Sequence, residues 1–178
     1  EGHRLRREII ATQLANAIVN RGGPTIVTKL ADQTGADAPA IAMAYAATRD
    51  AFGLTELNAA IDALDGKISG ALQLGLYGEL QDLLLDQLAW FIRNVNLAGG
   101  DLEAVVARYR DGLAEIAAHL DTILPPAARE SLAERARTLV SQGVPEELAE
   151  RLAALPVLAE GPDIVRVATL AGRPVRDV

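Results

Sequence analysis

The stretch GALQLGLYGELQDLLLDQLAWFIRNV, residues 70–95, decides the fold of this chain, because its apolar residues recur at helical spacing along its whole length. The stripe on one face comprises Leu72, Leu76, Leu80, Leu84, Leu88, Phe91 and Val95. At 1.5 Å per residue, a helix of this length extends about 40 Å. We therefore predict a long helix that serves as the spine of the molecule.

The rest of the chain has the same helical periodicity, and no segment alternates polar and apolar residues over the length of a strand. The sequence therefore predicts an all-α fold, a multi-helix bundle with helix-turn-helix-like ends. Besides the spine, the expected helices span residues 5–20, 25–34, 38–52, 56–64, 101–124, 126–142, 145–156 and 162–171.

The segment 96–100 is a predicted turn, and Asp101 is the predicted N-cap of a return helix. A short loop between two long amphipathic helices favours antiparallel neighbours, so we expect a long central helical hairpin. Its return helix would face inward through Leu102, Val105, Tyr109, Leu113, Ile116, Leu120 and Ile123.

Other helix boundaries follow from caps and from helix breakers. Asp37 and Thr55 are predicted N-caps. Proline cannot continue a helix easily, so Pro156 is expected to end the helix that opens at Pro145. Gly75 and Gly78 on the spine are predicted to let another helix approach closely.

The chain contains a repeat with an offset of 137 residues. It places Val27, Leu30, Ala31 and Ile41 against Ile164, Val167, Ala168 and Val178, with Gly35 against Gly172. The second copy stops where its second helix would start, so we expect the native chain to continue beyond Val178. We predict three parts: residues 1–66 with the first copy, residues 67–143 with the helical hairpin, and residues 144–178 with the start of the second copy.

The amino-acid composition of the chain limits the classes of partner that it is expected to bind. Half of the residues are hydrophobic but only 3% are aromatic, and the net charge is −7, which disfavours nucleic acid as a partner. No apolar run approaches the roughly 20 residues that span a bilayer, so no membrane partner is expected. The sequence has no cysteine, which excludes disulfides and thiolate metal sites and agrees with a cytoplasmic location.

The first copy also has the spacing of a DNA-binding helix-turn-helix, with Ala31, Gly35 and Ile41 at the diagnostic positions. A recognition helix needs side chains that contact bases and phosphates, yet this one offers Arg49 and Thr48 and little else. The negative net charge also removes most of the electrostatic term in DNA affinity. We interpret the turn as a packing device, with a free-standing helix-turn-helix adaptor or DNA-binding module as the alternative.

No chemical site emerges from the sequence. The glycines do not form the G-x-G-x-x-G of a dinucleotide fold, and His3 and His119 do not form a metal-binding pair. Glu115 and His119 lie four residues apart in one copy only, whereas a di-iron bundle needs Glu-x-x-His twice. We therefore predict no catalytic, cofactor-binding or metal-binding residue here.

Three features could still have a function. Glu79, Asp82 and Asp86 share a helical face and are better explained as its solvated side, although an independent all-α enzyme could use them. Glu147 and Arg151 are expected to form an i, i+4 ion pair. Trp90 and Phe91 are expected in the core, with an anchoring patch for another part of the protein as the alternative. That alternative stays open.

The segment HRLRREIIATQLANAIVNRGGPT, residues 3–25, resembles the large bacterial NAD-dependent glutamate dehydrogenases. The likeness continues through ADQTGADAPAIAMAYAATRDAFGL, ALDGKISGALQL, WFIRN, QGVPEELAERLAALP and IVRVATLAGRPV, and so covers most of the chain. It corresponds to the helical region near the C-terminus of those long subunits, after the catalytic part.

The resemblance implies an oxidoreductase of amino-acid catabolism that converts L-glutamate and water to 2-oxoglutarate and ammonia, with NAD as the hydride acceptor, in a homo-oligomer. None of the family's catalytic lysine, aspartate or glycine motifs matches positions of this sequence. The implied role here is a non-catalytic helical domain that serves assembly or regulation. Its expected partners are the rest of its own chain and further copies of it.

Overall fold

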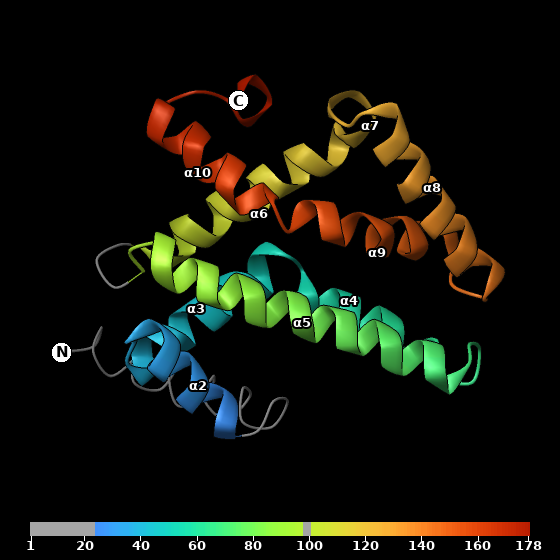
Figure 1. The fold of residues 1–178 in the computed structure, drawn as a ribbon, viewed down its shortest axis with the longest axis horizontal. Coiled ribbons are helices and arrows are strands. Elements are labelled where there is room, and N and C mark those ends of the chain that lie inside the picture. The colour runs from blue at the N-terminus through green and yellow to red at the C-terminus, as the bar shows by residue number, and fades with distance from the viewer. Residues whose placement is uncertain (1–23, 98–100) are drawn as a thin grey trace. The chain divides into compact units, whose positions relative to one another are not determined.

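The computed structural model describes residues 24–97 and 101–178, so the predicted helix 5–20 and His3 lie outside the described part (Figure 1). Throughout the described part the fold is all-α, as predicted, and contains no strand. Its elements are α2 (Pro24–Thr34), α3 (Ala38–Ala51), α4 (Leu54–Asp62), α5 (Gly70–Asn94), α6 (Leu102–Ala118), α7 (Leu120–Ile123), α8 (Pro126–Ser141), α9 (Glu146–Leu158), α10 (Gly161–Ala171) and the short 3-10 helix η1 (Val175–Asp177).

The chain divides into two compact units. Unit 1 contains the residues up to Asp50 together with Leu84–Ala107, and unit 2 contains Ala51–Leu83 together with Arg108–Val178. The predicted three-part division and the central hairpin remain predictions.

Unit 1 is built around α3 and the second half of α5. Along α3 the buried side chains are mostly small, which suits close helix packing. Phe91 is completely buried and meets Trp90 in an edge-to-face arrangement, with ring centroids 5.2 Å apart. The other buried residues of this unit include Leu30, Ile41, Ala44, Tyr45, Leu88 and Leu97.

In unit 2, hydrogen bonds join α4 to the first half of α5. The side-chain amide of Gln73 donates to the carbonyl oxygen of Ile61 at 3.0 Å, and the Tyr77 hydroxyl donates to the Asp62 carboxylate. Within both units, the predicted stripe of α5 is largely confirmed, because Leu76, Leu80, Leu88 and Phe91 are buried.

The helices α6 and α10 cross at two glycines (Figure 1). A Cβ atom added to Gly112 of α6 would lie 2.5 Å from Cγ2 of Val165 on α10. Conversely, a Cβ atom added to Gly161 of α10 would collide with Cδ2 of Leu113 on α6. Each glycine therefore makes room for an apolar side chain of the other helix.

This crossing corrects the prediction for the spine. No other part of the described chain lies within 4 Å of where Cβ atoms of Gly75 and Gly78 would be, so no helix approaches closely there. The close approach depends on Gly112 and Gly161 instead, because these two glycines lie on helix faces that pack against each other.

The caps at Asp37 and Asp101 are confirmed. Oδ1 of Asp37 accepts a hydrogen bond from the backbone N–H of Ala40 at 2.9 Å, and Oδ1 of Asp101 accepts one from Glu103 at 3.0 Å. The predicted cap at Thr55 is wrong, because Thr55 lies inside α4, which begins after Gly53 in the left-handed conformation.

The predicted return helix is interrupted at His119, which separates α6 from α7. The His119 Nδ1 atom lies 2.8 Å from the carbonyl oxygen of Glu115, and the backbone at His119 has a φ of −120° and a ψ of 10°. The break turns Ile123 away from the core, and its side chain is 51% exposed where an inward position was predicted.

Pro156 does not end α9, contrary to the prediction, because the helix continues to Leu158. Proline removes only its own N–H, and the backbone N–H of Ala159 still donates to the carbonyl oxygen of Leu155 at 2.9 Å. The buried side chains of α9 include Leu148, Leu152 and Leu155.

The structure contains the repeat found in the sequence. The same offset of 137 residues takes the first and last residues of α2 to those of α10, and both helices have eleven residues. Each is followed by a glycine with a left-handed backbone, with φ of 70° at Gly35 and 62° at Gly172. Helical turns then begin at Ala38 and Val175, which are also equivalent.

Candidate functional site

The three acidic residues of α5 lie on a solvated helix face, as predicted. Glu79, Asp82 and Asp86 are all exposed, and Glu79 forms an ion pair with Arg135 of α8. The described residues contain no group of three or more histidine, cysteine, aspartate or glutamate side chains that could hold a metal ion. Glu147 and Arg151 form no ion pair within this part of the chain, so that prediction is wrong.

His119 lies on the surface, and its ring contacts the carbonyl oxygen of Glu115 in α6. At the other aromatic feature, Phe91 belongs to the core and Trp90 is half-buried. The predicted core role is therefore confirmed for Phe91.

The helix that could have read DNA is a core helix. Thr48 is completely buried, and its hydroxyl donates to the carbonyl oxygen of Ala44 at 2.9 Å. Arg49 pairs with the Asp50 carboxylate at 2.6 Å. Because both candidate base-reading side chains are engaged within the protein, the DNA-binding alternative is not supported.

A concavity in unit 2 lies between α8, α9 and the α6–α7 junction. The turn that joins α8 to α9 contains Gly143, which has a φ of +99°. A Cβ atom at this position would lie 3.2 Å from the carbonyl oxygen of Lys67. Val144, buried in this turn, donates its N–H to the carbonyl oxygen of Leu139 at 3.1 Å. The hydrogen bond fixes the turn from which α9 begins.

The groove has a volume of about 660 Å³ and a mostly apolar floor. The floor comprises Ala117, Leu120, Leu132, Ala133, Ala136, Val140, Ala153 and Ala154. We call this set the α8–α9 groove. Alanine predominates, and its small side chain leaves room for the side chains of another helix.

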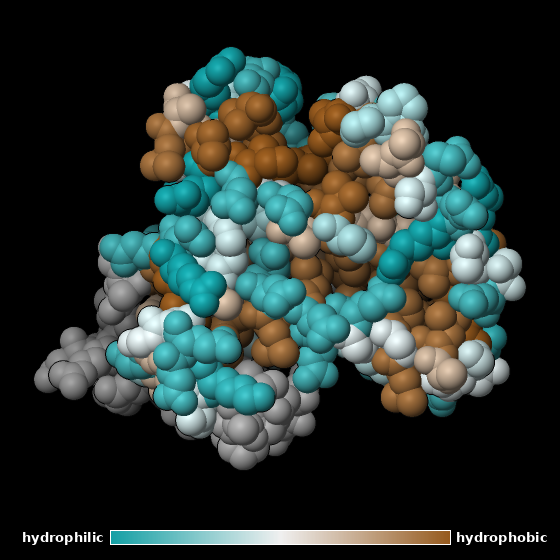
Figure 2. All heavy atoms as spheres, in the orientation of Figure 1, coloured by the Kyte–Doolittle hydropathy of each residue, from teal (hydrophilic) through white to brown (hydrophobic). Residues whose placement is uncertain are grey.

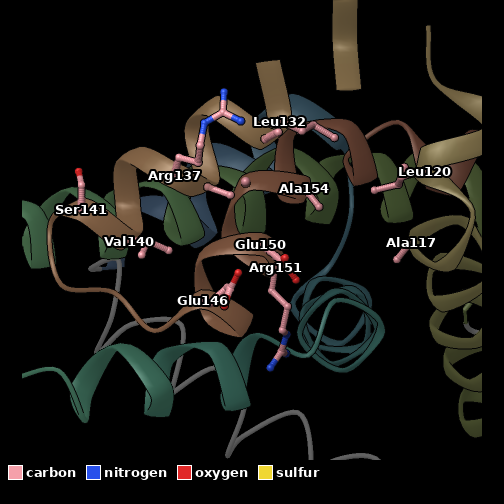
Figure 3. Close-up of a pocket in the computed structure, with 13 residues that line it drawn as sticks. Ala117, Leu120, Leu132, Arg137, Val140, Ser141, Glu146, Glu150, Arg151 and Ala154 are labelled. Carbon is pink, nitrogen blue, oxygen red and sulfur yellow. The ribbon is translucent and has the colours of Figure 1, made fainter. Parts of the chain in front are cut away.

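Charged side chains form the rim (Figure 3). The guanidinium groups of Arg137 and Arg151 lie on opposite sides of the groove, and Glu146 and Glu150 project from α9. Arg137 pairs with Glu130 at 2.9 Å, and the Ser141 hydroxyl donates to the carbonyl oxygen of Thr138 at 2.7 Å. Ser141 has no base beside it among the described residues, so the groove suits apolar docking better than chemistry.

Sequence reasoning did not find this groove. Val140, which lines the groove from α8, is 43% exposed. The width of the apolar face of α8 could have indicated the groove. Leu132, Ala136 and Val140 follow one another at a spacing of four residues, and the buried Leu139 lies beside them. One neighbouring helix cannot cover all of that face.

Two tyrosines have raised pKa values. Burial raises the pKa of Tyr109, whose side chain lies in the core of unit 2. The hydrogen bond to Asp62 raises the pKa of Tyr77, because ionising the hydroxyl would remove the donor and place two negative charges together. Neither tyrosine lines the α8–α9 groove.

The described part of the chain is an all-α domain with an apolar groove, and comparison with known proteins gives its family. Residues 1–178 match the family described as "Glutamate dehydrogenase, C-terminal", and the chain belongs to that family. It is similar to the NAD-specific glutamate dehydrogenase of Halomonas elongata, with 36% identity over 166 residues, or 93% of this chain. It is also similar to the NAD-specific glutamate dehydrogenase of Pseudomonas aeruginosa, with 34% identity over 178 residues, or 99% of this chain.

The match covers only a small part of each relative. The chain spans 10% of the length of the Halomonas enzyme and 11% of the Pseudomonas enzyme. No solved structure matches the chain. Among the described helices, none is both long and apolar enough to cross a membrane.

Proposed function

We propose that this chain is a non-catalytic helical domain of an NAD-dependent glutamate dehydrogenase and that it serves the assembly or regulation of the catalytic part. The whole enzyme would convert L-glutamate, NAD and water to 2-oxoglutarate, ammonia and NADH. The proposed compartment is the cytoplasm. The proposed partners are the remainder of its own chain and further copies of the same subunit.

The observation that carries the proposal is the α8–α9 groove in a chain that spans about a tenth of its relatives. The groove presents an alanine- and leucine-lined floor with charges at the rim, which is the usual arrangement of a protein docking surface. We propose no NAD-binding site in the domain. The described residues offer no glycine-rich turn between a strand and a helix to meet a pyrophosphate.

The test places a charge in the groove of the full-length enzyme. Val140→Glu puts a carboxylate on the apolar floor, and because Val140 is 43% exposed the variant domain should fold. Ala127→Glu is the matched control on the same helix, at an exposed position outside the groove. Light scattering gives the subunit number, and steady-state kinetics give kcat and KM for glutamate.

We expect Val140→Glu to lower the assembled mass or change the glutamate kinetics, since an unpaired charge cannot be buried in an apolar contact without a large cost. Ala127→Glu should match the wild type. If both variants have wild-type mass and wild-type kinetics, the groove has no role in assembly or regulation and the proposal is wrong.

A further inference from the structure

The helix α10 is apolar on two sides. One side is buried against α6 at Val165, which is 1% exposed. The other side carries Ile164, Val167 and Leu170 at three-residue spacing, with Val167 48% and Leu170 75% exposed. Figure 2 shows hydrophobic side chains gathered on the surface over α10. We call this set of three residues the α10 stripe.

Positive charge lies beside the α10 stripe. Arg166 precedes Leu170 by one helical turn, and Arg173 follows Leu170 by three residues. Neither arginine forms an ion pair with another described residue. The helix itself contains a single acidic residue, Asp163, at its start. The stripe is therefore an apolar ridge with a basic edge near its C-terminal end.

The α8–α9 groove is long enough to hold the α10 stripe. Its floor on α8 extends from Leu132 to Val140, which is about 12 Å along the helix axis. The distance from Ile164 to Leu170 along α10 is about 9 Å on the same basis. Because alanine predominates on the floor, a ridge of larger side chains can pack into it.

The rim of the groove has the charge that complements the basic edge of the stripe. Glu146 and Glu150 project from α9, and neither forms an ion pair with another described residue (Figure 3). Arg137 is paired with Glu130 at 2.9 Å. The rim charges that remain are two carboxylates and Arg151, so the rim is negative where it meets a partner. Complementary charge of this kind sets the register of a contact.

We infer that the α8–α9 groove is the docking site for the α10 stripe of a second copy of this chain. Val167 and Leu170 of one copy would lie on the alanine-lined floor of the other. The two arginines beside the stripe would meet the two glutamates of the rim. The inference rests on the proposed docking role of the groove, and it names the occupant.

The stripe must come from another copy, because α10 contributes no residue to the groove of its own domain. The opposite side of α10 is fixed against α6, where the side chain of Val165 occupies the space beside Gly112. Each copy carries one stripe and one groove, so the same contact can repeat between copies. Homo-oligomers commonly close such repeated contacts by symmetry.

A photo-crosslinker on the stripe of the full-length enzyme tests the contact. Leu170→p-benzoylphenylalanine should give, on irradiation, a two-subunit product on a denaturing gel. Mass spectrometry should place the crosslink in residues 132–140 or 146–154 of the second subunit. Thr169→p-benzoylphenylalanine is the matched control at the neighbouring exposed position and should give none of this product, because its side chain points away from the stripe. Equal yields at the two positions, a crosslink to any other surface, or no crosslink would overturn the inference.

A charge swap tests the complementary edges. Arg166→Glu together with Arg173→Glu should lower the yield of the groove crosslink from position 170 about tenfold, since attraction to the rim becomes repulsion. Adding Glu146→Arg and Glu150→Arg should restore the yield, which a defect in the folding of α10 would not allow. An unchanged yield in the first variant, or no recovery in the second, would overturn the inference.

The result for Val140→Glu separates this inference from the proposed function. If Val140→Glu has wild-type mass and kinetics while position 170 crosslinks to the groove, the inferred contact forms and the proposed role in assembly or regulation is wrong. If Val140→Glu changes the mass or the kinetics and no groove crosslink forms, the groove functions with another occupant and the inference is wrong.

Discussion

At the scale of single residues, the contact between Gly112 and Val165 constrains the packing of α6 against α10. The space opposite Gly112 is occupied by a β-branched side chain that is 1% exposed. A valine has few rotamers and cannot move aside as the end of a leucine can. The crossing of α6 and α10 therefore requires that residue 112, like residue 161, has no Cβ atom.

We predict that Gly112→Ala lowers the free energy of unfolding by about 1 to 3 kcal/mol, through overpacking against Val165. Gly75→Ala is the control, because it meets nothing within 4 Å in the described chain and should stabilise α5 by up to about 1 kcal/mol. Urea unfolding followed by circular dichroism measures both. Adding Val165→Ala should reduce the effect of Gly112→Ala, and additive effects would contradict the proposed clash.

Tyr109 gives the domain a predicted sensitivity to alkaline pH. Burial raises its pKa in the folded state above the value near 10 of an unfolded chain. Its contribution to stability is therefore complete below about pH 10 and decreases as the pH rises towards the folded-state pKa, because only the unfolded state releases the proton readily.

The expected result is that Tyr109→Phe flattens the decrease in unfolding free energy between about pH 9 and pH 11, as measured by urea unfolding at each pH. Parallel curves for the wild type and the variant would show that Tyr109 ionises equally in both states. That outcome would contradict the assigned effect of burial.

At the scale of elements, the sequence predicted most helix bounds because glycine, proline and aspartate mark them locally. α2, α5 and α10 begin and end within one residue of the predicted positions. The predicted helix ends are wrong where tertiary contacts or side-chain hydrogen bonds determine the end of the helix, as at His119 and Pro156. A local sequence pattern cannot show which helix packs opposite a given glycine. The close approach of helices at Gly112 and Gly161 was therefore not predicted.

Pro156 shows how tertiary packing overrides a local signal. It lies inside α9 at an exposed position, two residues before the end of the helix, while Leu152 and Leu155 anchor the helix in the core. The helix tolerates the missing N–H and the crowding of the Leu152 carbonyl, because burial of the leucines offsets that cost.

Pro156→Ala should therefore raise the free energy of unfolding by about 2 kcal/mol, the cost of an interior proline less its benefit in the unfolded chain. Differential scanning calorimetry measures the gain, and helix content from circular dichroism should not fall. A lower melting temperature would mean that the proline is required for the geometry between α9 and α10.

At the scale of the whole molecule, the sequence predicted the family and the fold class but not the α8–α9 groove. The family could be predicted because the similarity covers almost the whole chain. The groove could not, since its floor combines residues from three stretches of chain, around Ala117, Leu132 and Ala153. The same alanines and leucines are typical of any helix interface, so their type alone does not show which of them remain uncovered.

The central claim is that this domain contributes no part of the cofactor site of its enzyme. Calorimetric titration of NAD into the full-length enzyme, and into a version that lacks the residues equivalent to 1–178, tests it most directly. We predict the same number of NAD sites per chain and the same dissociation constant for both. Loss of the NAD site on removal of this domain, with the remaining protein still folded by circular dichroism, would contradict the claim.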